Sequence, residues 1–202
     1  MIKSAHLRSI HAALLAGALA LAVVPDVRGQ TSPGNGDSSN GDIGSSAVSA
    51  TVAVPTDYLT SSIVKNINGA RAECGSYDPA YRIDCLRQRL ADIAQRIPAG
   101  PAYSEARQII SRASSKLGRI QAGIVDRKAP QQRSRANPRL RQTKIYAAAK
   151  REKLGKAMAQ ARQVIEEAET QLLRAVQNSD KRAGHYQQIA AALDSTKVLL
   201  RS

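Results

Sequence analysis

A long stretch without helix-breaking residues, 138–178, most constrains how this chain can fold. After Pro138 it contains no proline and one glycine, Gly155, so it predicts a single helix from Pro138 to Asn178. At about 1.5 Å per residue, that helix would be about 60 Å long. Because helices in proteins are stabilised mainly by packing of an apolar face, partner helices must cover it. The sequence therefore predicts an all-α protein.

The second half of this predicted helix carries a regular apolar seam. Its apolar residues alternate at steps of four and three, the heptad spacing of coiled coils. The seam predicts a facing helix, either from this chain or from a second copy, so a homo-oligomer through Leu154–Ala175 stays open. The seam residues are Leu154, Met158, Ala161, Ile165, Ala168, Leu172 and Ala175.

Other stretches with helical periodicity complete the predicted fold. One runs from Asp57, a possible N-cap, to about Cys74, and a second starts at Pro79 after Asp78 and stops before Pro98. A third, 101–124, repeats the spacing of the seam, and we expect the two to pack antiparallel as a central pair. A last helix follows residue 180. Together they predict an elongated antiparallel bundle, or coiled-coil-like hairpin, of about five helices.

The N-terminus has the pattern of a secretory signal. Two basic residues precede an uncharged apolar run that ends at Pro25, and the run is too short for a comfortable membrane span. Cleavage is expected after Gly29 or Ala22, which predicts a periplasmic or secreted protein without a transmembrane span in the mature chain. Glycine, serine and asparagine dominate the following segment, which we expect to be a disordered tether.

These patterns predict one helical domain behind the signal and the tether. The predicted signal peptide is 1–29, the flexible linker 30–56 and the helical domain 57–202. Within the domain, 57–97 is expected to form a helical hairpin and 101–202 a long hairpin with a C-terminal helix.

The two cysteines, Cys74 and Cys85, lie on either side of the first predicted turn. In an exported chain with only two cysteines, a disulfide is the default expectation. The bridge would close a loop of about 12 residues and stabilise the hairpin by roughly 3 kcal/mol. The thiols have no neighbouring histidines, so they do not predict a metal site.

The positive charge of the chain is concentrated in one segment. The formal net charge is +14, and the segment 127–156 holds 11 Lys and Arg against one acidic residue. These cations point in all directions around a predicted helix, so we expect an exposed basic tip, which either binds an anionic partner or carries solvated charge that serves solubility alone. The candidate anion-binding residues are Lys128, Arg133, Arg135, Arg139, Arg141, Lys144, Lys150, Arg151 and Lys153.

The sequence carries no pattern typical of an enzyme. Of the histidines only His185 follows the signal, which disfavours a multi-histidine metal site and most histidine-assisted nucleophiles. We expect His185 to make an interhelix hydrogen bond or to be exposed to solvent. A glycine-rich phosphate loop is also missing, so neither a cofactor nor a catalytic residue is predicted.

Three functions stay open on these grounds. The first is a non-enzymatic interaction protein whose basic tip binds an anionic envelope surface or an acidic protein. The second is a holdase-type chaperone, since exported basic helical hairpins resemble in outline the periplasmic chaperones that cradle unfolded outer-membrane proteins. The third is nucleic-acid binding, which the positive charge suits but the predicted export disfavours.

Overall fold

The computed structural model describes residues 54–135, 137–175 and 180–201. They lie in the second of the two units into which the chain divides, Ser46–Ser202. The predicted signal peptide and the predicted linker up to residue 53 lie outside the described residues.

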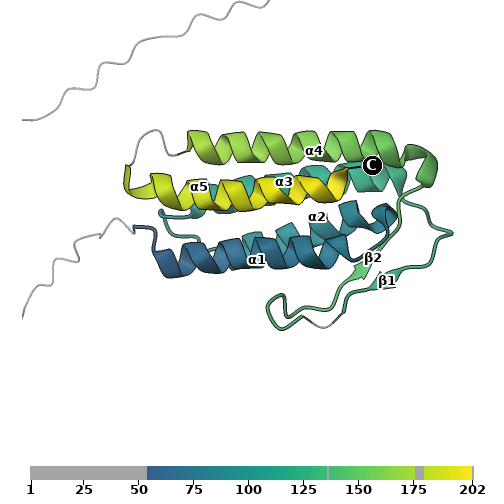
Figure 1. Cartoon of the computed structure of the whole chain (residues 1–202), viewed down its shortest axis with the longest axis horizontal. Coiled ribbons are helices and arrows are strands. Elements are labelled where there is room, and N and C mark those ends of the chain that lie inside the picture. The colour runs from purple at the N-terminus through teal and green to yellow at the C-terminus, as the bar shows by residue number, and fades with distance from the viewer. Residues whose placement is uncertain (1–53, 136, 176–179, 202) are drawn as a thin grey trace, which may run out of the picture. The chain divides into compact units, whose positions relative to one another are not determined.

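The described part of the chain forms a helical bundle with one very short sheet (Figure 1), which confirms the all-α prediction. None of its helices combines the length and the apolar character needed to span a membrane. The elements are α1 (Asp57–Gly75), α2 (Pro79–Arg96), α3 (Ser104–Ile124), β1 (Gln132–Arg133), β2 (Ile145–Tyr146), α4 (Arg151–Arg174), α5 (Asp180–Asp194) and the 3₁₀ helix η1 (Ser195–Leu200).

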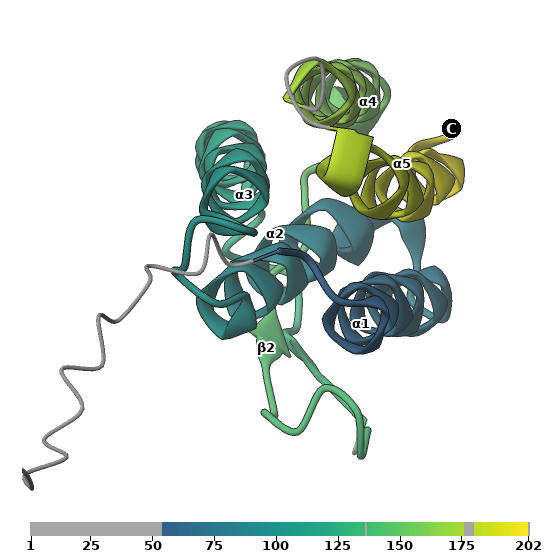
Figure 2. The same ribbon diagram turned by 90° about the vertical axis from the view of Figure 1, so that its left-hand side faces the viewer.

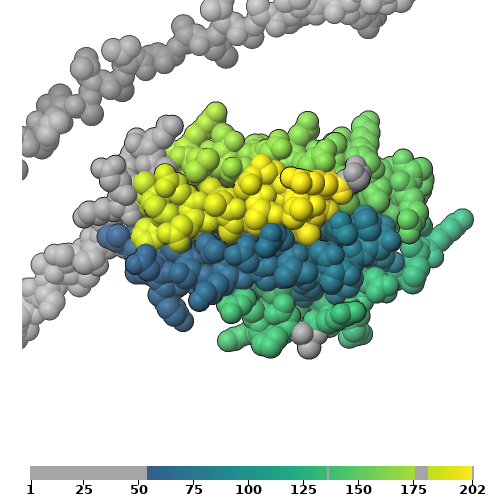
Figure 3. Space-filling view, in the orientation of Figure 1, coloured from purple at the N-terminus to yellow at the C-terminus, as the bar shows by residue number. Residues whose placement is uncertain are grey.

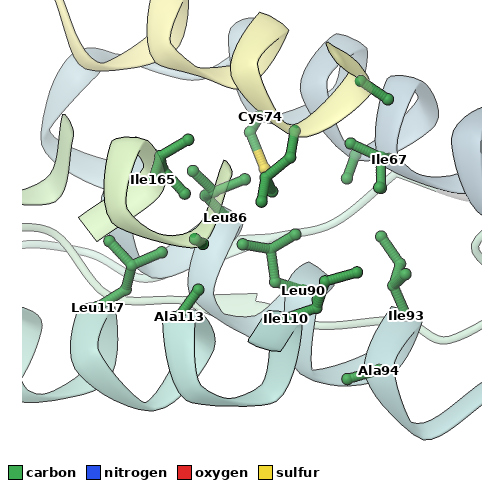
Figure 4. Packing of buried hydrophobic residues seen from close by; sticks show 14 of the residues in the cluster. Ile67, Cys74, Leu86, Leu90, Ile93, Ala94, Ile110, Ala113, Leu117 and Ile165 are labelled. Atoms are coloured by element: carbon green, nitrogen blue, oxygen red, sulfur yellow. The ribbon is translucent and has the colours of Figure 1, made fainter. Parts of the chain in front are cut away.

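Helix α2 lies in the middle of this bundle (Figure 2) and contacts α1, α3, α4, η1 and β2. Its apolar stripe is buried, and Figure 4 shows Leu86 beside Ile165 of α4 and Leu90 beside Ile110 of α3. All four side chains are fully buried. The core is therefore organised around α2 and not around the pair formed by α3 and the seam helix, which was expected to be central.

The predicted packing of α3 against α4 is present and antiparallel. Lys116 forms an ion pair with Glu167, while the backbone N–H of Lys150 donates to the carbonyl of Ile124 over 2.8 Å. The apolar seam of α4 is buried inside this chain, so it is not available to a second copy. The reason for expecting a homo-oligomer through this seam is therefore removed. The buried seam residues are Met158, Ala161, Ile165, Ala168 and Leu172.

The starts of the first two helices are capped by side chains. Thr56, and not Asp57 as expected, caps α1, because its hydroxyl accepts from the N–H of Leu59 at 3.3 Å. Asp57 instead lies in the first turn, where its negative charge interacts favourably with the helix dipole. Asp78 caps α2 as predicted, accepting from the N–H of Ala80 at 2.9 Å.

The predicted disulfide joins α1 to α2. Cys74 and Cys85 are bonded, with their Cα atoms 5.6 Å apart. Both side chains are fully buried in the hydrophobic core (Figure 4 labels Cys74). The bridge therefore holds the end of α1 against the helix around which the core is built.

The continuous helix predicted from Pro138 to Asn178 was wrong. Helix α4 begins only at Arg151, and its described part ends at Arg174, while 176–179 lie outside the described residues. The first half of the predicted helix is instead a turn followed by strand β2, which pairs antiparallel with β1. The basic residues from Arg139 to Lys150 therefore do not stand on a helix, whereas Arg151 and Lys153 lie in the first turn of α4.

Hydrogen bonds to α2 explain why this segment is extended. The N–H of Ala149 donates to the carbonyl of Ala80 at 2.8 Å, and the N–H of Ala147 donates to a carboxylate oxygen of Asp84 at 2.9 Å. The intrinsic preference of such residues for a helix amounts to only a few tenths of a kcal/mol each. Tertiary hydrogen bonds and burial of Tyr146 outweigh it.

The C-terminal segment closes the bundle as expected. Tyr186, Ile189 and Leu193 of α5 are buried, as is Leu200 of η1. In Figure 1 this segment, coloured yellow, runs beside α4. The segment up to Leu200 therefore packs into the core.

Candidate anion-binding surface

The connection between α3 and α4 carries most of the predicted anion-binding residues. We call residues 127–150 the basic arm. It contains eight Lys and Arg and no Asp or Glu. Strands β1 and β2 pair Gln132 with Tyr146 and Arg133 with Ile145 within it. In Figure 3 the teal and green surface of the arm extends beyond α1 along one edge of the helical unit.

A buried ionic network attaches the arm to α1 and α2. The hydroxyl of Tyr146 in β2 donates to Oε1 of Glu73 in α1 at 2.7 Å. Arg89 of α2 donates from Nη2 to the same oxygen at 2.7 Å and from Nη1 to the carbonyl of Gln142 at 2.8 Å. The Arg89 guanidinium also lies 5.9 Å from the centre of the Tyr146 ring. One buried guanidinium thus binds a carboxylate, an aromatic ring and the backbone of the arm.

The protonation of this network suits its role as an anchor. Burial, followed by the hydrogen bond to Glu73, raises the pKa of Tyr146 far above its ordinary value, so the phenol remains a donor. Burial alone would lower the pKa of Arg89, but the hydrogen bond to Glu73 and the nearby Tyr146 and Asp92 raise it overall. Both partners of Glu73 therefore keep their protons.

Lys144 belongs to the anchor and not to the free cations. Its Nζ lies 2.8 Å from Oδ1 of Asp92, a buried carboxylate on α2. Arg151 lies 3.4 Å from Asp78, but both side chains are largely exposed, so this pair has little strength. Two of the nine predicted residues thus lie near carboxylates of the same chain, and only Lys144 forms an ion pair with a buried one, that of Asp92.

The other predicted cations are exposed, and within the described residues none forms an ion pair. They do not gather in a single tip, as the helical prediction required. One group surrounds the junction of α3 and α4, and the other surrounds the turn at 137–141, with Arg133 between them in β1. The seven residues are Lys128, Arg133, Arg135, Arg139, Arg141, Lys150 and Lys153.

The turn at 137–141 faces an open groove of about 680 Å³. Helix α1, the end of α2 and the turn form its walls, and we call it the arginine groove. Among the described residues that line it, three are arginines and none is acidic. The lining residues are Leu59, Ser62, Ile63, Asn66, Ile93, Arg96, Ile97, Pro98, Asn137, Pro138, Arg139 and Arg141.

Sequence reasoning missed Arg96 as a member of this surface. Asp92 precedes Arg96 by one helical turn, a spacing that favours an ion pair between the two side chains. In the structure, Arg96 Nε donates to the Asp92 carbonyl at 3.2 Å, and Nη1 donates to the carbonyl of Arg139 at 3.1 Å. Since the second contact depends on where the arm packs, no local signal in the sequence could have revealed it.

Arg141 has an unusual backbone conformation. Its φ of 54° lies in the left-handed region, which costs a residue with a Cβ atom roughly 1–2 kcal/mol. The Arg141 N–H donates to the Asn137 carbonyl at 2.9 Å, and the Asn137 side chain accepts from the Arg139 N–H at 3.0 Å. Buried Leu140 also holds the turn against the bundle. The turn is therefore a defined element that presents two arginines.

Replacing Arg141 by glycine is expected to raise the free energy of unfolding by about 0.5–1 kcal/mol, because glycine adopts this φ without strain. Arg135 has no such backbone strain, so Arg135→Gly is expected to lower stability by a similar amount through the entropy of the unfolded chain. Urea unfolding of both variants measures the difference. A loss of stability on Arg141→Gly would contradict the strain at this position.

A polar cluster around Thr60 in the described residues resembles a reactive site but is structural. The Thr60 hydroxyl lies 2.9 Å from His185 Nδ1 and 2.8 Å from the Tyr103 hydroxyl. Asp57 lies 3.9 Å from the same ring nitrogen, whereas a catalytic triad places its acid and its nucleophile on opposite nitrogens. Thr60 is also fully buried. Of the two alternatives expected for His185, the structure shows the interhelix hydrogen bond, to Thr60 of α1.

Comparisons with known proteins assign no family to the chain. No family model matches it, and neither a curated protein nor a solved structure shows significant similarity to it. Within the described residues, no group of three or more His, Cys, Asp or Glu side chains is arranged to hold a metal ion.

Proposed function

We propose that this is an exported, non-enzymatic interaction protein whose basic arm binds an anionic component of the cell envelope. The observation that carries the proposal is the arm itself, with exposed cations and no acidic residue over 24 positions. Like charges held close together repel, and an anionic partner removes that repulsion. A polybasic segment gains about 1 kcal/mol per Lys or Arg near an anionic bilayer.

The anchoring of the arm supports this reading of the charge. A flexible basic tail would lose much conformational entropy on binding, whereas ordered side chains lose less. Tyr146, Lys144 and the Arg89 contact with Gln142 hold the arm on the bundle. The cations on the outer side of the arm are thus presented by a stable platform.

Export rests on two features. The N-terminal sequence has the pattern of a secretory signal, and the Cys74–Cys85 bridge suits an oxidising compartment such as the periplasm or the extracellular space.

The other two functions have no specific observation in their favour. The large apolar side chains that are exposed in the described residues are scattered over several elements, whereas a holdase needs a continuous apolar surface for its clients. They are Val54, Tyr58, Ile145, Leu173 and Val198. Nucleic-acid binding would need an aromatic side chain that can stack on a base, and Tyr146, the aromatic residue of the basic arm, is buried.

Sedimentation with lipid vesicles tests the proposal. The mature protein is expected to bind vesicles containing phosphatidylglycerol and not neutral phosphatidylcholine vesicles. Binding should weaken strongly between about 0.1 M and about 1 M salt, where the Debye length falls from about 10 Å to about 3 Å. Changing Arg133, Arg135, Arg139 and Arg141 to glutamine should lower the affinity at least about tenfold.

A variant with the same loss of charge elsewhere provides the control. Arg107, Arg112, Arg119 and Arg174 lie on α3 and α4, outside the arm. Their replacement by glutamine is expected to weaken vesicle binding much less than the arm variant does. Equal binding to neutral and anionic vesicles, or an equal loss in both variants, would contradict the proposed role of the arm.

A further inference from the structure

The arginine groove differs from the rest of the basic surface in being a shaped site. Arg96 comes from the end of α2, while Arg139 and Arg141 come from the turn of the arm, and all three line the same groove. Its lining also includes the polar residues Ser62 and Asn66 of α1. Polar or basic residues from three separate elements thus border one open volume without an acidic residue among the described lining.

Backbone contacts hold these arginines in place. Arg96 donates to the carbonyls of Asp92 and Arg139, so part of its guanidinium is oriented by groups that carry no net charge. The stem of Arg139 lies against α1, because a Cβ atom added to Gly69 would be 3.4 Å from Arg139 Cδ. The left-handed conformation of Arg141 sets the direction of the turn. The positive charges are therefore arranged, but not neutralised.

We propose that the arginine groove binds a phosphomonoester group carried by a lipid headgroup of the anionic surface. Guanidinium groups bind phosphate oxygens through paired hydrogen bonds. A phosphomonoester carries about 1.5 to 2 negative charges at neutral pH and three acceptor oxygens, which suits several guanidiniums at once. A carboxylate has one charge and two oxygens, so one arginine is enough to satisfy it. The volume of the groove also accommodates a headgroup.

This inference rests on the proposed function and adds a specific ligand to it. Diffuse attraction to the arm depends on surface charge alone and does not distinguish one anionic lipid from another. A shaped phosphate site does distinguish them, because a phosphodiester offers fewer free oxygens and less charge than a phosphomonoester. Lipid preference at constant surface charge is therefore the property to measure.

The test compares vesicles containing phosphatidic acid, a phosphomonoester, with phosphatidylglycerol vesicles adjusted to the same zeta potential. The wild-type protein is expected to bind phosphatidic acid at least about tenfold more tightly. The groove variant Arg96→Gln/Arg139→Gln should lose this preference. The control Arg127→Gln/Arg133→Gln removes the same charge from the arm outside the groove, so it should weaken binding to both vesicles and keep the preference.

A second groove variant guards against misfolding. Arg141→Asn removes the guanidinium and keeps a residue that tolerates the left-handed conformation, and it should also reduce the preference. Circular dichroism of each variant checks that the helices are intact. Equal binding of wild type to both vesicles would overturn the groove proposal and leave the proposed function standing, whereas no binding to either vesicle would remove the proposed function itself.

Competition separates the lipid from free phosphate. Inorganic phosphate is expected to displace the protein from phosphatidic acid vesicles more effectively than chloride at the same ionic strength, which supports a phosphate site. Displacement by phosphate from wild type and the groove variant alike would overturn it. Binding of free phosphate without any vesicle preference would overturn the assignment to a lipid headgroup.

Discussion

Replacing Arg89 by leucine is expected to lower the free energy of unfolding by about 3–5 kcal/mol, which is the usual cost of removing one partner of a buried ion pair. The Arg89 side chain is fully buried, and Glu73 and Asp92 are nearly so. Without the guanidinium, Glu73 keeps only the hydrogen bond from Tyr146, since its second carboxylate oxygen has no hydrogen-bond partner among the described residues. The variant thus leaves a negative charge in the core with poor compensation.

Urea unfolding followed by circular dichroism measures this loss. Arg119→Leu, on the exposed face of α3, is the control and should change stability by no more than about 0.5 kcal/mol. Adding Glu73→Leu to Arg89→Leu should cost far less than the two single changes summed, because the second replacement removes the unpaired charge. If Arg89→Leu were no more destabilising than the control, the buried network would have no role in stability.

The same variant tests the link between the core and the basic arm. Arg89 also binds the Gln142 carbonyl, and Tyr146 shares its carboxylate. Amide hydrogen exchange should therefore quicken at Ala147 and Ala149, whose N–H groups hold the arm on α2. Exchange in α4 should change less. Equal acceleration everywhere would show that Arg89 stabilises the bundle as a whole and not the arm in particular.

The helices that could be predicted are those whose signals are local. Asp78 followed by proline marked the start of α2, and the 3-4 spacing of apolar residues marked the buried faces of α3 and α4. The cysteine pair predicted the bridge because only one pairing was possible. The caps and the apolar spacing involve residues within one or two helical turns, and the two cysteines are only 11 positions apart, so a single sequence is enough to read these signals.

The failure at residues 138–150 has the opposite cause. Their composition favours a helix, and the residues that prevent it lie far away in the sequence. Tyr146 finds its partner Glu73 at a separation of 73 residues, and Lys144 finds Asp92 on α2. A single sequence does not show which polar side chains will meet in the core, so neither the extended arm nor its anchor could be predicted.

The candidate site was predictable in charge but not in shape. The density of Lys and Arg indicated an exposed basic segment, and seven of the nine predicted residues are exposed without an ion pair within the described part of the chain. The groove needs Arg96 from α2 beside Arg139 and Arg141 from the arm. That meeting depends on the same long-range packing that removed the predicted helix.

Removing the disulfide is expected to lower the free energy of unfolding by about 3 kcal/mol, because the bridge closes a short loop and restricts the unfolded chain. The two cysteines are 11 positions apart and fully buried, so Cys74→Ala/Cys85→Ala avoids placing hydroxyl groups in the core. Urea unfolding with and without a reducing agent provides an internal control. Wild type should lose stability when reductant is present, and the double variant should be insensitive to it.

The loss should centre on the contact between α1 and α2, where Glu73 lies next to Cys74, so the arm should also become less protected from hydrogen exchange. A wild-type protein whose unfolding midpoint is the same in both conditions, with complete reduction verified in the unfolded state, would contradict a stabilising role for the bridge.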